Sequence, residues 1–388
     1  IIFLNIWGFN MDIKVFNTKL DLIGIIDIFS SFRYKQKFYD IGEFELHIPF
    51  NIGDLEILQK DNIIYVNEQN SFIVDTRQIK LNQDGSEYIQ VNGKSLLNIL
   101  NRRIIYNQIV EKNNANEVVK RIVNENVIAP KNIKRKIENI AIGELADTLN
   151  IDYQNRYGNV LDEIIGISKT TDVSFYILLD HINKKLLLKS FSGTDRTINQ
   201  NIISPCVFSR DYENVEEQEY VDSLNNYKNV TLVAGSGEGI NRKVFEVGEH
   251  EGLNRYELYT DARDLSDKEQ KTRIVTNEDG SEYEENYEVD IPIETYNKIL
   301  EQRGKEKLRE CTEVETFESK ISLLSNLEYG KDFRLGDTVT VINKKWNLVL
   351  DTKITEIEEV WESTKSLSIT FGNNIPTLLD KIKMKVRG

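Results

Sequence analysis

The sequence predicts a mainly β chain with an α+β insertion, and three observations support that fold class. Many short segments alternate apolar and polar residues, as half-buried strands do, and residues 43–48 and 349–360 are clear examples. Turn-forming dipeptides such as Asp84-Gly85 separate segments of this kind. Between residues 106 and 200, apolar residues recur at helical spacing in two segments. Because 388 residues are many for one core, we expect a multidomain chain.

Residues 11–105 are predicted to form a β-barrel-like domain. Residues 76–81 and 86–91 are expected to pair as a hairpin, and a helix that carries Leu96 and Leu97 on one face follows them. The other expected strands are 13–16, 27–34, 43–48, 62–66 and 71–75. A meander of about seven strands has the scale of a small barrel or sandwich.

Residues 106–200 are predicted to form an inserted α+β domain. Asn114 is placed to cap a helix with Val118 and Val119 on its apolar face. The other expected elements are a helix at 157–167 and a hairpin of 173–179 with 185–191.

Residues 201–310 are predicted to form a β-rich domain with hairpin arms and a helix. Two hairpin-like arms are expected at 243–247 and 255–259, where exposed strands could pair with the sheet edge of a neighbouring protein. A later charged segment contains Asp279-Gly280-Ser281-Glu282-Tyr283, which repeats the pentapeptide at 84–88, so we expect the same hairpin turn at both places. The remaining expected elements are strands at 207–208 and 227–234 and a helix from Pro292 to Arg309.

Residues 311–388 are predicted to form a second β-barrel-like domain followed by a C-terminal tail. Leu335-Gly336-Asp337 is interpreted as a turn that leads into one of its strands. The expected strands are 312–317, 338–342, 349–360 and 367–371. No residue of this β unit indicates catalysis.

The composition argues against several classes of protein. Lys and Arg number 49 against 63 Asp and Glu, which gives a net charge of −14, so we expect no general nucleic-acid-binding surface. Cys206 and Cys311 are isolated and are expected to be incidental thiols. No run approaches ~18 apolar residues, so we predict no transmembrane segment and no membrane anchor. Residues 1–10 are interpreted as an upstream extension, with Met11 as the working start.

The motifs that most suggest a binding site have simpler structural interpretations. Gly235-Ser236-Gly237-Glu238-Gly239 follows a strand, as a phosphate-binding loop does, but the next residues continue as a strand and no GK[ST] is present. A glycine-rich hairpin loop is therefore favoured. His47, His181 and His250 have none of the spacings of metal ligands. The basic loop Lys131–Lys136 could touch phosphates, although a solvated surface loop is the simpler interpretation.

Carboxylates are too numerous for the sequence to single out a catalytic pair. Asp211 with Glu213 and Glu356 with Glu358 are two of many close pairs, whereas a glycosidase needs two carboxylates at a defined separation in a cleft. No GxSxG motif and no Cys–His set stands out. We therefore predict no catalytic, cofactor-binding or metal-binding residues, no cofactor and no enzyme activity.

Three sets of residues together carry a family resemblance that extends from Met11 to Lys383. The sets are Leu232-Val233-Ala234-Gly235-Ser236-Gly237-Glu238-Gly239 with Arg242, Glu246-Val247-Gly248, Gly252-Leu253-Asn254-Arg255, Glu257-Leu258 and Asp261-Ala262-Arg263-Asp264-Leu265; Val91-Asn92-Gly93-Lys94-Ser95-Leu96-Leu97 with Arg102-Arg103-Ile104-Ile105; and Leu335-Gly336-Asp337 with Val339, Val341 and Phe371-Gly372-Asn373. On these residues the chain resembles the phage tail proteins of the siphovirus Gp37-like family, found in siphoviruses and prophages of Gram-positive bacteria. The third set is shared more loosely with the N-terminal parts of tail-associated lysins and hub proteins.

The resemblance implies a structural function and a multidomain, hub-like architecture. Such proteins resemble the baseplate hub of contractile tails, in which small β-barrel domains from three copies form a pseudo-sixfold ring that continues the tail tube. By this resemblance, residues 11–105 and 311–388 are tube domains, and residues 106–200 and 201–310 are peripheral domains. The implied protein is a homotrimer at the tail tip or baseplate that joins the sixfold tube to a threefold tip or spike. No catalytic residue is carried over, and the terminal peptidase or lysozyme domain of tail lysins is expected to be absent.

The partners implied by the resemblance are a tail tube or distal tail protein, a tape measure protein and a tail spike or tip protein. The virion would be assembled in the cytoplasm of the host bacterium, and its DNA would pass through the ring without specific binding. An acidic channel would repel phosphates over about a Debye length, ~8 Å at physiological salt. Two alternatives stay open: a tail-tip enzyme that cleaves cell-wall polymer, and a receptor- or carbohydrate-binding tail module. A flexible tail, a contractile tail and a phage-tail-like bacteriocin are all compatible with the sequence.

Overall fold

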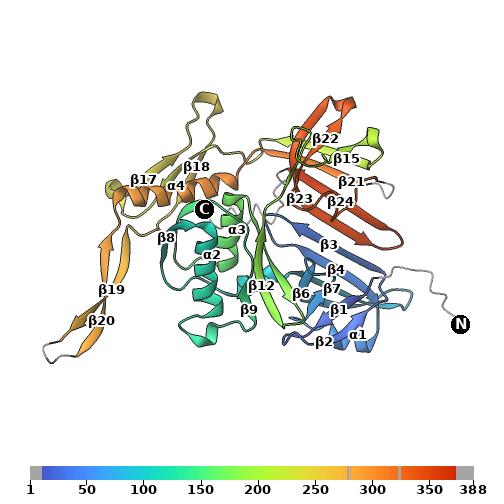
Figure 1. Ribbon diagram of the computed structural model, residues 1–388, viewed down its shortest axis with the longest axis horizontal. Coiled ribbons are helices and arrows are strands. Elements are labelled where there is room, and N and C mark those ends of the chain that lie inside the picture. The colour runs from blue at the N-terminus through green and yellow to red at the C-terminus, as the bar shows by residue number, and fades with distance from the viewer. Residues whose placement is uncertain (1–10, 278, 280, 322–324, 373–388) are drawn as a thin grey trace.

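The computed structural model describes residues 11–277, 279, 281–321 and 325–372. These residues contain 24 strands and four α-helices, and the predicted class, a mainly β chain with some helices, is confirmed (Figure 1). The expectations for residues 1–10 and for the tail beyond residue 372 lie outside the described residues. Within the described ranges, no helix has the length and apolar character needed to cross a membrane.

The N-terminal half of a large sheet is built from seven strands. Their inward residues are apolar and their outward residues are mostly polar, as in β4, where Phe44, Leu46 and Ile48 are buried. The elements are β1 Ile13–Phe16, β2 Leu22–Ile26, β3 Ser31–Lys37, β4 Glu43–Pro49, α1 Ile52–Ile57, β5 Ile63–Tyr65, β6 Ser71–Leu81 and β7 Glu87–Ser95. The predicted hairpin of β6 and β7 is confirmed, with Leu81 opposite Glu87.

The C-terminal half of the same sheet has a separate core of aromatic side chains. Phe208, Phe317 and Phe371 are fully buried there, with ring centroids 5.1 Å apart for Phe208 and Phe371. The strands of this half are β13 Asp195–Arg196, β14 Val207–Ser209, β15 Val215–Ser223, β21 Val314–Ile321, β22 Thr338–Asn343, β23 Leu348–Trp361 and β24 Lys365–Gly372.

The two halves join where β3 pairs antiparallel with β23, two strands that are more than 300 residues apart in the sequence (Figure 1). The strand order is β15-β21-β24-β23-β3-β4-β7-β6-β5-β1-β2; in addition, β22 pairs with β23, and β13 and β14 pair with β22. This path is open at both ends, so the described strands form no closed barrel. In place of two separate barrels, the structure has two halves of one continuous sheet.

The elements between residues 109 and 191 form an α+β block whose apolar core is shared with the first half of the sheet. Val118 of α2 and Ile164 of α3 are fully buried in a cluster that also contains Phe16 and Leu96. The predicted cap is confirmed, since the Asn114 side chain accepts a hydrogen bond from the backbone N–H of Asn116 at 3.1 Å. The elements are β8 Ile109–Asn114, α2 Ala115–Val123, β9 Ile140–Ile142, β10 Asn150–Asn155, α3 Val160–Thr171, β11 Ser174–Asp180 and β12 Lys185–Phe191.

The two hairpin-like arms expected at 243–247 and 255–259 are in fact one hairpin, which the first segment forms with β16, and one parallel strand. Both segments pair with the same central strand, β16, antiparallel in one case and parallel in the other. The helix α4 packs on this small sheet, and a long two-stranded hairpin extends from it (Figure 1). The elements are β16 Val230–Ala234, β17 Val244–Val247, β18 Glu257–Asp261, β19 Lys268–Thr276, β20 Glu282–Asp290 and α4 Ile293–Arg309.

Other differences arise where local pattern is weak. The strand expected at 27–34 begins only at Ser31, as β3, and residues 27–30 connect it to β2. The six-residue helix α1 is too short to show helical periodicity. The strand β15 was not expected because it is largely polar, VEEQEYVDS. The helix expected at Leu96 is a 3-10 helix that runs to Arg102.

Candidate functional site

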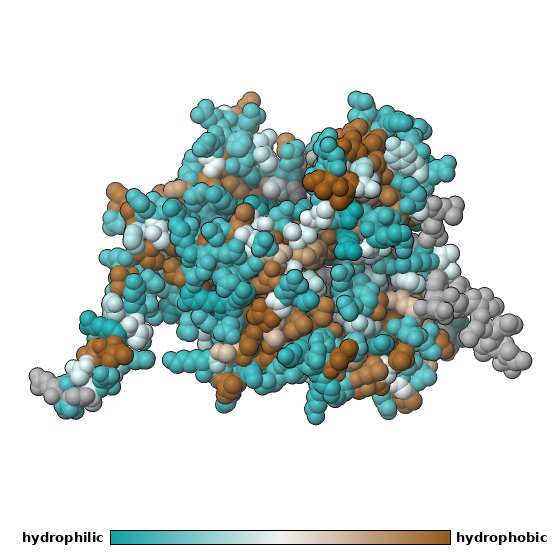
Figure 2. Space-filling view, in the orientation of Figure 1, coloured by the Kyte–Doolittle hydropathy of each residue, from teal (hydrophilic) through white to brown (hydrophobic). Residues whose placement is uncertain are grey.

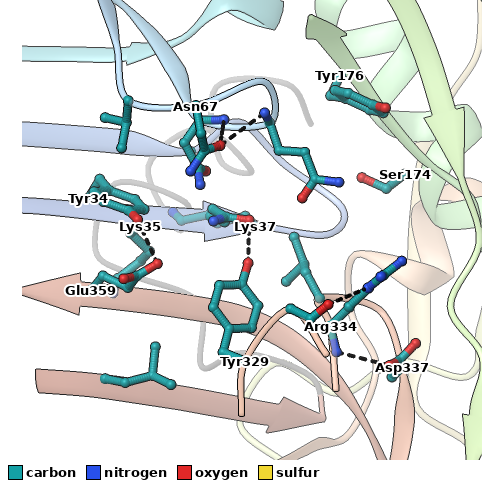
Figure 3. Close-up of a pocket in the computed structure, with 18 of the residues that line it drawn as sticks. Tyr34, Lys35, Lys37, Asn67, Ser174, Tyr176, Tyr329, Arg334, Asp337 and Glu359 are labelled. Atoms are coloured by element: carbon teal, nitrogen blue, oxygen red, sulfur yellow. Dashed lines mark hydrogen bonds between the residues drawn. The ribbon is translucent and has the colours of Figure 1, made fainter. Parts of the chain in front are cut away.

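A cleft of about 1310 Å³ lies along the join between the two halves of the large sheet (Figure 3). Its walls come from β3, the start of β11, the turn at 67–70 and the loop at 325–337. The hydroxyl of Tyr34 donates to Glu359 at 2.6 Å, and the hydroxyl of Tyr329 donates to Gln36 at 3.1 Å. Each of these hydrogen bonds connects the N-terminal half of the sheet with the C-terminal half.

The polar groups of the cleft hold the two halves together and do not form an acid–base pair. Burial raises the pKa of Tyr34 and of Tyr329, so both phenols stay protonated and act as donors. Glu359 also pairs with Lys365 at 2.7 Å. No histidine or cysteine is among the described residues that line the cleft. These polar contacts therefore fix the position of β3 against β23.

Asp337 explains why the motif Leu335-Gly336-Asp337 has its sequence. Its carboxylate is buried and accepts from the backbone N–H of Thr194, the backbone N–H of Arg334 and Nε of Arg196, each at 2.9 Å. Gly336 has a φ of +88°, which only glycine adopts without strain. A Cβ on Gly193 would lie 1.6 Å from the carbonyl oxygen of Gly336, so the two backbones touch. The turn therefore anchors β13 to the start of β22.

The glycine-rich loop 235–239 is the hairpin loop that the sequence favours, since it connects the antiparallel strands β16 and β17. It is followed by a three-residue 3-10 turn, and β17 begins only at Val244. The guanidinium of Arg242 donates to the carbonyl of Ala234 at 2.8 Å and to Asp261 at 2.7 Å. A hydrogen bond from Arg263 lowers the pKa of Asp261 to about 2, so this acceptor stays ionised.

Tyr296 of α4 packs against the same loop and binds its backbone. Its ring is fully buried, and its hydroxyl donates to the carbonyl of Leu265 and accepts from the N–H of Ser236, both at 2.8 Å. Arg255 lies between two acids, 2.7 Å from Glu246 and 2.6 Å from Glu257. The residues that carry the family resemblance in this region thus contact one another and shape the fold.

The structure brings none of the three histidines together. His47 contacts Glu45 and stacks on Tyr88, His181 lies against Phe16, and His250 is on an exposed loop. The described ranges contain no group of three or more His, Cys, Asp or Glu that could hold a metal ion.

Neither cysteine lies in a reactive setting. Cys206 and Cys311 are free thiols, and burial raises the pKa of Cys206 to about 12.

Three of the four carboxylates named as pairs from the sequence contact lysines. Asp211 pairs with Lys344 at 3.0 Å, and Glu356 and Glu358 both pair with Lys35, at 3.5 and 4.0 Å. The last two contacts lie across the β3–β23 junction.

One partly buried polar cluster carries no local sequence signal. Glu163 of α3 accepts from Tyr153 at 2.9 Å, and Arg303 of α4 pairs with Asp264 at 3.0 Å and with Glu306 at 3.9 Å. Burial raises the pKa of Glu163 to about 7, with the Arg303 charge opposing that effect. The cluster connects the α+β block to α4, and its members are up to 153 residues apart in the sequence.

Comparison with known proteins agrees with this fold. The family model described as Siphovirus ReqiPepy6 Gp37-like protein matches residues 12–373. No curated protein sequence is significantly similar to the chain.

Three solved structures share the fold over nearly their whole length. The prophage tail protein gp18 from Listeria monocytogenes EGD-e has a TM-score of 0.52 and 12% identity, over 97% of this chain and 98% of that one. The tail protein from Neisseria meningitidis MC58 has a TM-score of 0.53 and 12% identity, over 94% and 97% of the two chains. The 43 kDa tail protein of prophage MuSo2 from Shewanella oneidensis has a TM-score of 0.53 and 13% identity, over 93% and 97%.

The family match covers far more than half of the chain, and the resemblance carried by the three sets of residues is thereby confirmed. The chain belongs to the siphovirus Gp37-like family.

Proposed function

We propose that this protein is a structural component of a phage tail, or of a phage-tail-like particle, and that it acts as a homotrimeric hub. In the virion it sits at the tail tip or baseplate, joins the sixfold tail tube to the threefold tip or spike and lets the genome pass. The observation that carries the proposal is the fold shared with three tail proteins, two of them from prophages, over 93–97% of this chain.

The division of the chain into functional parts belongs to the same proposal. Residues 11–105 and 311–388 act as tube domains whose strands surround the channel, and residues 106–200 and 201–310 lie at the periphery. The pairing of β3 with β23 supports this division, because it makes one rigid unit of the two sheet halves. The ion pairs of Lys35 with Glu356 and Glu358 and the hydrogen bond of Tyr34 to Glu359 reinforce that junction.

The proposed role needs no chemistry from the protein. The motif residues Arg242, Arg255 and Asp337 and the carboxylates Asp211, Glu356 and Glu358 all form structural contacts, which favours a structural protein over an enzyme. The partners are a tail tube or distal tail protein, a tape measure protein and a spike or tip protein. The net charge of −14 would help the channel to repel the phosphates of the departing DNA.

The solution mass of the purified chain tests the trimer. Light scattering over a concentration series should give a mass near three times 45.0 kDa. A chain that stays at 45.0 kDa at every concentration would contradict self-assembly as a hub. It would favour a peripheral, receptor-binding module.

A further inference from the structure

A two-stranded arm, β19 and β20, projects from the body of the molecule (Figure 1). Its strands have nine residues each, so it extends for about 30 Å at roughly 3.3 Å per residue. The hydrogen bonds and ion pairs found for the described residues between 269 and 289 all stay within the arm. An isolated two-stranded hairpin is marginally stable in water, so a surface that receives this arm would stabilise it.

The two faces of the arm differ in charge. Residues opposite one another in an antiparallel pair share a face, so Ile274 lies beside Glu284, and Thr276 lies beside Glu282. This acidic face also carries Glu288 and Asp290 against a single base, Lys268. Its other residues are Gln270, Thr272 and Asn286.

The opposite face of the arm has a mixed character. It carries Arg273 with Tyr287 and Glu285, and Lys271 beside Glu269. Its charges are paired, whereas no ion pair is found for Glu282 or Glu284 within the described part of the chain. The acidic face is therefore the one that presents unpaired charge, and Figure 2 shows the arm standing clear of the body.

A surface of opposite charge lies on the α+β block, in the basic loop Lys131–Lys136. The guanidinium carbon of Arg135 lies 3.5 Å from the centroid of the Tyr106 ring, and Lys136 pairs with Glu138 at 2.8 Å. Lys131 and Lys134 are exposed, and no ion pair is found for either within the described residues. Ile133 between them is 72% exposed.

The two surfaces are opposite in charge, and both carry an exposed apolar residue. Each has one exposed isoleucine, Ile274 at 69% and Ile133 at 72%, flanked by charges of one sign. An apolar contact ringed by charges of opposite sign is the usual arrangement of a small specific interface. We infer that the acidic face of the arm docks on the basic loop of a second copy of this chain.

This inference rests on the proposed self-assembly and adds the surface that makes it. The contact is head-to-tail, since the arm and the loop are different surfaces, and such contacts close into a ring when the rotation between copies allows it. The arm would then clamp each copy to the next at the periphery. Because its charges are exposed, the contact should weaken as salt rises and the Debye length falls from about 10 Å at 0.1 M to about 3 Å at 1 M.

Site-directed cross-linking tests the contact in the full-length chain. Two differently tagged copies are co-expressed in a Cys311→Ser background, one with Glu284→Cys and the other with Lys134→Cys, and a bismaleimide is added to the purified protein. We expect a covalent pair of the two tagged chains. The matched control replaces Glu284→Cys with Glu285→Cys, its neighbour on the opposite face, and should give at least fivefold less product.

Charge reversal provides a second measurement on the same contact. Glu282→Lys with Glu284→Lys should weaken association at least tenfold in sedimentation at 0.1 M salt. Adding Lys131→Glu and Lys134→Glu to the same chain should restore it to within threefold, because every arm in the ring then meets a loop of opposite charge again. Glu249→Lys with Glu251→Lys, an equal change of charge on another exposed loop, should leave association unchanged.

The outcomes separate this inference from the proposed trimer. A threefold mass with equal cross-linking from Glu284→Cys and Glu285→Cys, or with none, overturns the arm contact and leaves the trimer in place. Cross-linking that depends on the face, with a mass other than threefold, supports the arm contact and contradicts the trimer. A wild-type chain that is monomeric and gives no cross-link contradicts both.

Discussion

Asp337 offers the sharpest test of the structural reasoning, because one buried carboxylate holds three separate donors. Asp337→Ala would leave two backbone N–H groups and the guanidinium of Arg196 without their acceptor. Removing one partner of a buried ion pair costs about 3–5 kcal/mol. The Asp337 side chain is 4% exposed and that of Arg196 is 20% exposed, so the upper part of this range is reduced by access of water to the arginine. We expect a loss of about 3 kcal/mol in the free energy of unfolding.

Urea denaturation measures this loss. With an m-value of about 3 kcal/mol/M, the midpoint should fall by about 1 M. Tryptophan fluorescence is a suitable probe because Trp346 lies just before β23 and Trp361 is the last residue of β23, in the same half of the sheet. Asp337→Asn should lose less, since its amide oxygen still accepts a hydrogen bond.

The matched control is Asp211→Ala, which breaks an exposed pair with Lys344. Exposed pairs contribute about 0–1 kcal/mol, so the midpoint should hardly move. If Asp337→Ala and Asp211→Ala shift the midpoint equally, the assignment of Asp337 as the anchor of its turn is refuted.

Three further predictions concern other contacts. Tyr296→Phe should lower the free energy of unfolding by about 1–3 kcal/mol, because two backbone groups lose their hydrogen-bond partner. The control Tyr259→Phe, at an exposed tyrosine, should change it by less than about 0.5 kcal/mol, and equal urea midpoints for the two variants would contradict this prediction. Gly193→Ala should lower the thermal midpoint, because its methyl group would clash with the backbone at Gly336. Gly166→Ala in α3, where the methyl group has open space, should raise the free energy of unfolding by about 0.5–1 kcal/mol; a less stable Gly166→Ala than Gly193→Ala would contradict this packing. The raised pKa of Glu163, about 7, means that the folded chain keeps a proton that the unfolded chain loses above its ordinary pKa of 4.5, so wild-type stability falls as pH rises through that window. Glu163→Gln lacks this loss, and its stability relative to wild type should increase from pH 5 to pH 8 in urea titrations; a difference that is flat with pH would count against it.

Turns that depend on residues close together in the sequence could be predicted. The repeated pentapeptide is the clearest case, because its turn is fixed by neighbours within four residues. In both hairpins the aspartate, Asp84 or Asp279, accepts from the backbone N–H two residues later at 2.9 Å. The serine carbonyl then accepts from the N–H of Asn82 or Asn277. The prediction of one turn used twice is confirmed.

Long-range pairing could not be predicted in the same way. Nothing local in Lys35 indicates that it meets Glu356, and nothing in Glu163 indicates a neighbour on α4. The arm expected at 255–259 failed for the same reason, because this strand is locally regular but pairs parallel with β16, whereas the segment at 243–247 pairs with β16 in a local hairpin. The basic loop was visible in the sequence, but the acidic face that complements it depends on the register of β19 with β20.

The central claim is that three copies of this chain form a ring through which DNA can pass. Electron microscopy of the purified wild-type chain tests it most directly. If three copies form this ring, the particles have threefold symmetry, an open central channel lined by strands of the large sheet, and the α+β block at the rim. Particles without threefold symmetry, or a threefold particle whose centre is filled by α4 or the α+β block, would contradict the account.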